Sequence, residues 1–456
     1  MQRFKNLFSA IDMTEGAPWK KITLFAVPLL IGNIFQQMYS TADAIMLGRF
    51  VGDHALAAVG ASMPIFFLIF VLLMGLAIGV GVMVSQYFGA KKREELSYTI
   101  GTGITLITII SVILMVSGPF FTRPLLTLLG TPPEIMNDSV LYMNILLIGV
   151  LPVAYFNILS GILRSLGDSY SPLVYLIIAC ILNIALNFFL IPPLGAGGAA
   201  LGTVLAQAVS SVLCYRKICQ MKDTFDMGKS YLVPKREYVS QILKLGIPTG
   251  ASQVIIAVSF MLVQPLVNNF GAMIIATNLI IMRIDSIVMM PIFSFGHALT
   301  VFAGQNVGAG KMDRVNKGTK QGAILAVGTT LALIAVIVFF GRFIAGAFTQ
   351  TEEVIDLAAE WLRILAIGFL PFSFCMVLWG TIRGAGDAIS PLWGAAINSI
   401  FVRIPAAYIL VHFINSPIAI IYSVVVAMIT NTLISIVVYR MGKWRTKAII
   451  KQEMKT

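Results

Sequence analysis

The chain reads GILRSLGDSYSPL at residues 161–173 and GTIRGAGDAISPL at residues 380–392. The two stretches share Gly, Arg, Gly, Asp, Ser, Pro and Leu in one register, at a shift of 219 positions. The same shift aligns QYFGAKK (86–92) with QNVGAGK (305–311), and GVLP (149–152) with GFLP (368–371). Because this register holds across residues 79–175, it predicts an internal repeat of a whole structural unit.

The composition is that of an integral membrane protein, with 58% hydrophobic and only 11% charged residues. A helix needs about 20 mostly apolar residues to cross a bilayer core. Twelve stretches meet this requirement, at residues 22–47, 55–83, 98–117, 136–159, 171–190, 195–215, 241–268, 277–304, 320–340, 354–378, 390–411 and 416–440. Each half of the chain holds six of them. The sequence therefore predicts an all-α membrane protein of two parallel six-helix lobes, related by an axis along the membrane normal.

The formal net charge of +12 is explained by the distribution of the basic residues. Lys and Arg gather in alternate connections between the predicted spans, whereas the opposite connections contain only Arg49, Arg123 and Arg342. The positive-inside rule then places both termini in the cytoplasm of a multi-pass protein of the cell membrane. A nucleic-acid partner is not needed to account for the charge.

Four segments follow from this pattern. We expect an N-terminal six-helix lobe at 1–215, a cytoplasmic linker at 216–240, a C-terminal six-helix lobe at 241–440 and a basic cytoplasmic tail at 441–456. Apolar side chains at helical spacing around residues 4–11, beside basic ones, permit a short helix on the membrane surface.

The familiar signatures of enzymes and metal sites are missing from the sequence. It contains neither a GxxxxGK[ST] phosphate loop nor an HExxH helix. Its four cysteines, at 180, 214, 219 and 375, have no metal-binding spacing and are interpreted as small buried hydrophobes. We therefore expect no enzyme, no bound cofactor and no resident metal.

One carboxylate lies within the first predicted span, on a polar stripe formed by Asn33, Gln36, Gln37, Ser40 and Asp43. Asn183 and Asn187, four residues apart in the fifth span, reach a similar depth, as do Thr203 and Gln207 in the sixth. A carboxylate beside amide and hydroxyl oxygens suits reversible protonation or binding of sodium. The alternative is a structural carboxylate with amides that hold helices together.

The second half does not copy this carboxylate, because the position 219 residues after Asp43 is Leu262. It has charges of its own inside predicted spans, and Asp285 could pair with Arg363 or with Arg403, or these groups could contact a substrate. The candidate cavity residues are Gln36, Tyr39, Ser40, Gln207, Gln253, Asn278, Met282, Arg283, Asp285 and Met289.

The repeated turn around Asp168 and Asp387 is expected on the cytoplasmic side of each lobe. Its glycine permits a tight turn and its aspartate can cap the following helix. An Arg-to-Asp lock at the cytoplasmic mouth is the alternative interpretation.

Taken together, these motifs resemble the multidrug and toxic compound extrusion (MATE) family. The resemblance covers nearly the whole chain and includes Pro28 followed by YSTAD at 39–43, the Q-x-x-G-A-x-K turns and the R-x-x-G-D-x-x-x-P turns. It implies a V-shaped antiporter that exports cationic amphipathic compounds against an inward flow of protons or sodium. Asp43 matches the family's first-lobe carboxylate. Asn183 and Asn187 match a pair that in several members is Asn followed by Asp, so this chain has one negative charge fewer there.

We therefore expect a monomeric secondary-active multidrug antiporter in the lipid bilayer, with small organic cations as substrates. Its coupling site, for a proton or sodium, would comprise Asp43, Asn183, Asn187 and Thr203. The alternative is a flippase for a lipid-linked saccharide or another anionic lipid precursor, in which Arg283, Arg363 and Arg403 would grip a pyrophosphate. The sequence names neither the substrate nor the coupling ion.

Overall fold

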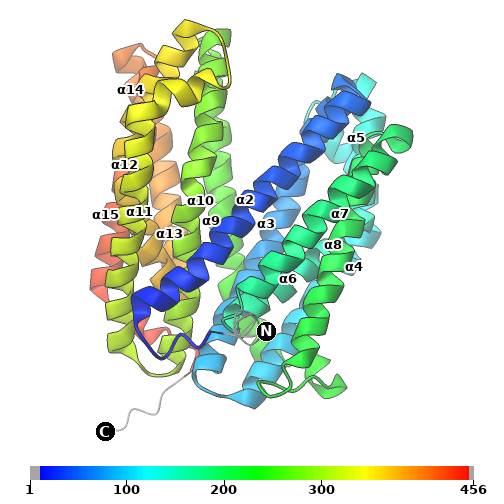
Figure 1. Cartoon of the computed structure of the whole chain (residues 1–456), viewed down its shortest axis with the longest axis vertical. Coiled ribbons are helices and arrows are strands. Elements are labelled where there is room, and N and C mark those ends of the chain that lie inside the picture. The colour runs from blue at the N-terminus through cyan, green and yellow to red at the C-terminus, as the bar shows by residue number, and fades with distance from the viewer. Residues whose placement is uncertain (1–10, 451–456) are drawn as a thin grey trace. The chain divides into compact units, whose positions relative to one another are not determined.

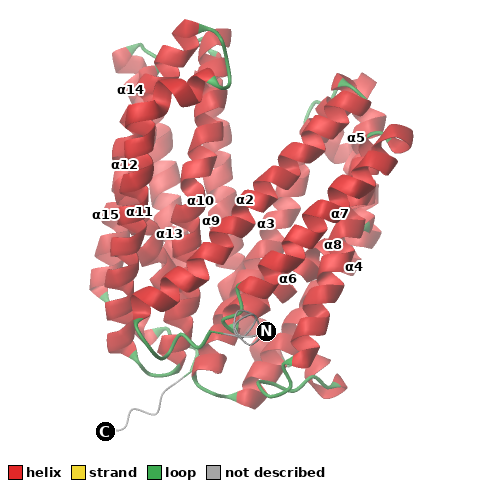
Figure 2. Ribbon diagram, in the orientation of Figure 1, coloured by secondary structure: helices red, strands yellow, loops and turns green. Residues whose placement is uncertain are grey.

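The structure, a computed structural model, describes residues 11–450. Throughout this range the secondary structure is helical, and no strand occurs in it (Figures 1 and 2). Most of the surface helix expected around residues 4–11 lies outside the described residues, as does the end of the basic tail.

The helices of the first half are α2 (Pro18–Phe50), α3 (Asp53–Gly89), α4 (Arg93–Leu128), α5 (Pro133–Ile148), α6 (Val150–Ser165), α7 (Tyr170–Leu194) and α8 (Ala196–Gln220). A short 3-10 helix, η1 (Lys229–Leu232), lies in the connection to the second half. That half contains α9 (Arg236–Asn268), α10 (Ala272–Gly308), α11 (Met312–Gly346), α12 (Glu352–Gly384), α13 (Ile389–Ala396), the π-helix η2 (Ile397–Arg403), α14 (Ile404–Ile414), α15 (Ile418–Met441) and η3 (Lys443–Thr446).

Within the described chain, 11 helices are long and apolar enough to cross a membrane, and the bent pair α5–α6 supplies a twelfth span. Here α13, η2 and α14 form one continuous span. The all-α, twelve-span fold expected from the sequence is confirmed.

The internal repeat is visible in the helix bounds. The helices α3 and α10 begin and end 219 positions apart, and the ends of α6 and α12 show the same shift. The repeated turn has the same geometry twice. Asp168 accepts hydrogen bonds from the Ser171 N–H (2.9 Å) and hydroxyl (2.6 Å), and Asp387 accepts them from Ser390 (3.0 and 2.6 Å). The glycine before each aspartate has a positive φ, of 94° and 99°. The predicted capping role is thereby confirmed.

The fourth predicted span is broken where the repeat would suggest continuity. The axes of α5 and α6 differ by 51° at Gly149. Pro152 has no N–H to donate to the preceding turn, which weakens the helix there. A Cβ on Gly149 would lie 2.3 Å from a Val204 methyl carbon, so the glycine also permits a close approach of α8.

The chain divides into two compact units that do not coincide with the two sequence halves. Unit 1 contains Pro28–Gly250, whereas unit 2 contains Met13–Val27 and the chain from Ala251 onward. Hence α2 and α9 each contribute to both units. The predicted linker is partly helical, because α8 extends to Gln220 and α9 begins at Arg236. The lobe boundaries expected at 215 and 241 stay predictions.

Close packing of small residues holds the first part of α9 against α3 within unit 1. A Cβ on Gly75 would lie 2.6 Å from the Gly246 carbonyl oxygen, and one on Gly79 would lie 2.9 Å from the Gly246 nitrogen. Glycines four residues apart let two helix backbones touch, as in small-xxx-small contacts of membrane helices.

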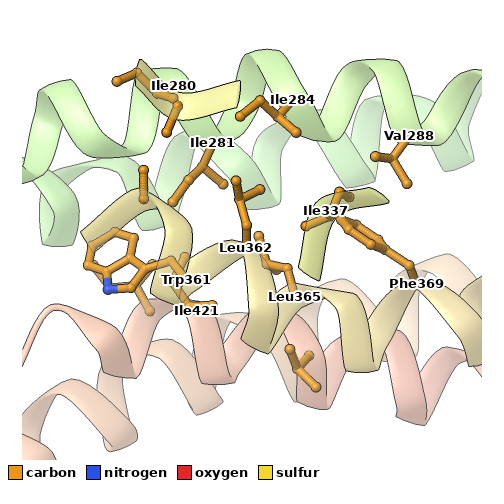
Figure 3. Close-up of a cluster of buried hydrophobic side chains, with 14 of the residues drawn as sticks. Ile280, Ile281, Ile284, Val288, Ile337, Trp361, Leu362, Leu365, Phe369 and Ile421 are labelled. Carbon is orange, nitrogen blue, oxygen red and sulfur yellow. The ribbon is translucent and has the colours of Figure 1, made fainter. Parts of the chain in front are cut away.

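The core of unit 2 includes apolar side chains of α10, α12 and α15, with others from α9, α11 and α14. Figure 3 shows Ile281 and Ile284 of α10 facing Leu362 and Leu365 of α12, with Ile421 of α15 below them. Such interdigitated packing provides dispersion contacts on every side, which is what stabilises helices against each other inside lipid.

Candidate functional site

A polar network joins α2 to α7 within unit 1. The Asn187 side-chain nitrogen donates a hydrogen bond to Asp43 Oδ1 at 2.6 Å, and it also lies 3.1 Å from Asn183 Oδ1. Both asparagines are fully buried, while Asp43 is half-buried. Their spacing of four residues on α7 places both amides on the face toward α2. The structure therefore brings together the three residues that the sequence placed at one depth.

The amide of Asn183 has two useful orientations. One terminal atom of the Asn183 amide lies 2.6 Å from Asp43 Oδ1. When this atom is the nitrogen, the Asn183 oxygen accepts hydrogen bonds from the Thr203 N–H (3.2 Å) and the Tyr39 hydroxyl (3.3 Å). With its oxygen turned to Asp43, the same short contact requires a proton on the carboxyl group. The network can thus serve both protonation states of Asp43 by exchanging donor and acceptor.

The sixth span completes the network. Tyr39, one turn before Asp43 on α2, donates its single hydroxyl hydrogen to Thr203 Oγ1 at 2.9 Å when the Asn183 oxygen faces Asp43, and to the Asn183 oxygen when that amide is turned. Next to Thr203, a Cβ on Gly202 would lie only 2.0 Å from Asn187 Oδ1. Gly202 therefore lets α8 approach the asparagine, whose Oδ1 is buried without a hydrogen-bond partner.

The hydrogen-bond partners of Asp43 are neutral amides, and no ion pair involves it within residues 11–450. A carboxylate at membrane depth without a cation is costly unless it is protonated, solvated or bound to an ion. This electrostatic situation is typical of a group that changes charge during its function.

The other candidates of unit 1 differ in exposure. Gln36 and Ser40 are exposed on α2, and the Ser40 hydroxyl donates to the Gln36 carbonyl oxygen at 3.2 Å. Gln207 is buried on α8, with its Oε1 unpartnered. The polar stripe expected along α2 is therefore divided, because Gln36 and Ser40 are exposed while Asp43 faces α7.

The cavity candidates of unit 2 do not share one environment. Gln253, Met282 and Arg283 are exposed, and Asn278 lies 3.6 Å from the Met282 sulfur. Met289, in contrast, is buried in the apolar core of unit 2. Its expected place on a cavity wall stays a prediction, and in this structure its side chain packs among the core residues.

Of the two possible partners of Asp285, Arg403 is the one whose charge acts on it. The Arg403 guanidinium carbon lies 3.5 Å from the centre of the Phe260 ring, a contact that nothing in the sequence pattern indicates. Arg283 and Arg363 are exposed, whereas Arg403 is buried, so the three arginines of the flippase alternative have unlike surroundings.

The MatE family model matches residues 28–189 and again residues 248–409, one match to each repeat. The chain belongs to the MatE family. Membership makes it a transporter, and the twelve candidate spans make it a multi-pass membrane protein.

Similar proteins cover almost the full chain. A probable multidrug resistance protein, YoeA of Bacillus subtilis, is 29% identical over 96% of this chain and 96% of its own length. A second one from that organism, YpnP, is 28% identical over 97% of this chain and 100% of its own. A solved structure described as MATE in the bent conformation superposes with a TM-score of 0.89 at 24% identity, covering 95% of this chain and 98% of that one.

Proposed function

We propose that this MatE transporter is a secondary-active antiporter that exports cationic amphipathic compounds in exchange for protons, with Asp43 as the coupling group. The observation that carries the proposal is the contact of Asp43 with two buried amides and no cation. The names of the similar proteins, which are multidrug resistance proteins, support organic compounds as the substrates.

Protonation of Asp43 would change which hydrogen-bond donors and acceptors its neighbours must supply. An ionised carboxylate needs donors, so it favours the Asn183 nitrogen, while a carboxylic acid can donate to the Asn183 oxygen instead. Turning that amide alters its bonds to Tyr39 and Thr203, and hence the contacts of α2 with α8. A proton that binds one arrangement more tightly shifts the population toward it, which is the requirement for coupling.

Sodium is the alternative coupling ion, as the sequence left open. A sodium site needs several oxygen ligands directed at one point. In unit 1 the Asn187 nitrogen points at Asp43, and the Asn187 oxygen lies against α8 at Gly202. This orientation of the donors favours a proton over sodium.

The topology belongs to the same proposal. The basic connections place both termini in the cytoplasm of the cell membrane, so that a proton entering at Asp43 would move inward while the compound moves out. We propose that one chain is the transporting unit, since unit 1 contains the complete Asp43 network.

The test is efflux of a fluorescent cationic dye from proteoliposomes under an imposed proton gradient or an imposed sodium gradient. We expect the proton gradient to drive efflux by the wild type, and Asp43→Asn to abolish it. Asp53→Asn is the matched control, because Asp53 is an exposed carboxylate at the start of α3. Unchanged coupling in Asp43→Asn would refute the role of Asp43. Efflux driven by the sodium gradient alone would make sodium, and not the proton, the coupling ion. Absence of efflux under both gradients would favour the lipid-flippase alternative.

A further inference from the structure

The connection between α8 and α9 runs along α4 within unit 1. At the first turn of α4, the Arg93 guanidinium donates hydrogen bonds to both carboxylate oxygens of Asp226 (3.0 and 2.7 Å) and to the Asp223 carbonyl oxygen (3.1 Å). One turn further, the Ser97 hydroxyl oxygen accepts from the Asp226 N–H at 2.8 Å. These bonds fix the first part of the connection to the beginning of α4.

The second part of the connection follows α4 into its apolar part. A Cβ on Gly101 would overlap the Tyr231 carbonyl oxygen, so the glycine lets the backbone of η1 touch the helix. One turn further, the Thr105 hydroxyl donates to the Leu232 carbonyl oxygen at 2.6 Å. At about 1.5 Å per residue, Thr105 is about 18 Å beyond Arg93 along α4. The connection therefore reaches the level of residues that belong to a candidate membrane span.

The place where the connection docks is a feature of the first repeat alone. The residues 219 positions after Gly101 and Thr105 are Lys320 and Ile324. A lysine side chain would prevent the close approach of a backbone, and isoleucine has no hydroxyl group to donate. The glycine and the threonine are therefore specific to the helix along which the connection runs.

The docked segment turns apolar side chains outward. Leu232 and Val233 are 40% and 64% exposed, whereas Phe225, earlier in the connection, is fully buried. The backbone beside the exposed pair is suited to an apolar environment, because the Leu232 carbonyl group is bonded to Thr105 and Pro234 has no N–H. An irregular segment with unpaired backbone groups would be costly at membrane depth. The exposed pair can therefore contact lipid at low cost.

Basic side chains flank this apolar pair on both sides. Lys229, Lys235 and Arg236 are exposed, and residues 229–236 contain no acidic side chain. Within residues 11–450, no ion pair involves any of the three. The Lys235 amino nitrogen lies 3.4 Å from the centre of the Tyr98 ring, which keeps this charge close to the beginning of α4. Apolar side chains between cationic ones are typical of a segment that lies at a membrane surface.

We propose that residues 229–236 form a binding surface for anionic phospholipids of the bilayer. Leu232 and Val233 lie among the acyl chains near the headgroups, and the three basic side chains bind the lipid phosphates. A membrane lipid fits this surface better than a free phosphate, because only a lipid covers the apolar pair. In the proposed orientation these lipids belong to the cytoplasmic leaflet. The inference goes beyond the transport function and does not depend on it.

The test measures which lipids surround this segment in the full-length protein. An NBD fluorophore is attached through Val233→Cys in a Cys219→Ser background, whose other native cysteines are buried. The protein is placed in phosphatidylcholine nanodiscs that contain a small, equal fraction of phosphatidylcholine or phosphatidylglycerol with a nitroxide near the start of the acyl chain. Both leaflets of a nanodisc have the same composition, so the result does not depend on the orientation of the protein.

We expect the lipid-borne nitroxides to quench the fluorophore and aqueous cobalt ions to quench it weakly. Nitroxide-labelled phosphatidylglycerol should be enriched around the label over phosphatidylcholine. Lys235→Gln or Arg236→Gln should each lower this enrichment by about fivefold, the effect of one basic side chain at an anionic membrane surface. Lys222→Gln, at an exposed lysine at the start of the same connection, is the matched control and should leave the enrichment unchanged.

Quenching by cobalt without quenching by the nitroxide lipids would place residue 233 in water and overturn the proposal. Equal quenching by the two lipids, with all basic side chains present, would overturn the preference for anionic lipid, and neither result requires a charge variant to fold. Equal losses of enrichment in Lys235→Gln and Lys222→Gln would show that residues 229–236 are not the binding surface. Displacement of the enriched lipid by soluble glycerol phosphate would indicate a site for a small anion and would also overturn the proposal.

Discussion

Gly202 is the residue on which the geometry of the Asp43 network depends. Because a Cβ there would overlap Asn187 Oδ1, Gly202→Ala must displace Asn187 or push α8 away. We expect a loss of about 1–3 kcal/mol in stability from overpacking and a strong decrease in proton-driven dye efflux. Thermal unfolding and proteoliposome efflux measure the two effects. Gly48→Ala in α2 is the control, since no atom lies within 4 Å of its Cβ position. Equal behaviour of the two variants would contradict this dependence.

The network residues could be predicted because polar side chains at membrane depth are rare and helical spacing assigns each to a face. This reasoning predicts four residues of the network, Asp43, Asn183, Asn187 and Thr203. Gly202 could not be found, since a residue without a side chain shows its importance only when two backbones approach. The stacking of Arg403 on Phe260 escaped prediction for a related reason, because it depends on how α9 and η2 are rotated against each other.

At the scale of elements, side chains around the turn between α10 and α11 hold residues 13–16 onto unit 2. The Arg314 guanidinium donates to the carbonyl oxygens of Met13, Glu15 and Gly16, and Lys311 donates to that of Thr14. The Met13 N–H in turn donates to Gln305 Oε1 at 3.0 Å. The repeated Q-x-x-G-A-x-K motif thus has a structural task in unit 2 that its sequence did not indicate.

Removing the guanidinium should release this segment. We expect Arg314→Met to increase amide hydrogen exchange in residues 13–17, because the carbonyl groups lose charged donors that hold them in place. Exchange in the core of α12 should stay unchanged. Lys317→Met, at an exposed lysine one turn further along α11, serves as the control. If residues 13–17 exchange at the wild-type rate in Arg314→Met, the guanidinium does not hold them.

The positions of the helices could be predicted from the lengths of the apolar segments, whereas the breaks and the π-helix within them could not. The break between α5 and α6 and the π-helix η2 both lie near prolines, yet α12 continues through Pro371. A proline removes one donor, and the packing around it decides whether the helix bends, widens or stays straight. That packing is a tertiary property which the local sequence does not contain.

For the whole molecule, the repeat predicted two six-helix halves, and the compact units divide the chain elsewhere. The beginning of α2 belongs to unit 2, and the beginning of α9 belongs to unit 1. Both transitions lie near equivalent prolines, Pro28 and Pro248. A sequence repeat shows which segments are homologous. It does not show in which compact unit each segment packs, because the repeat pattern is the same if the first parts of α2 and α9 pack in the opposite units. The V-shaped arrangement that the family resemblance implied stays a prediction.

The orientation of the molecule in the membrane follows from charge alone and can be tested directly. Cysteines are introduced at exposed Glu134, at the start of α5, or at exposed Ser230, in the basic connection before α9. The background is Cys219→Ser, because the other three native cysteines are buried. We expect a membrane-impermeant maleimide to label Glu134→Cys in intact cells and Ser230→Cys only after permeabilisation, since basic connections stay cytoplasmic. The unsubstituted background controls for labelling of native thiols. The reverse pattern would place the termini outside and would invert the direction of proton entry at Asp43.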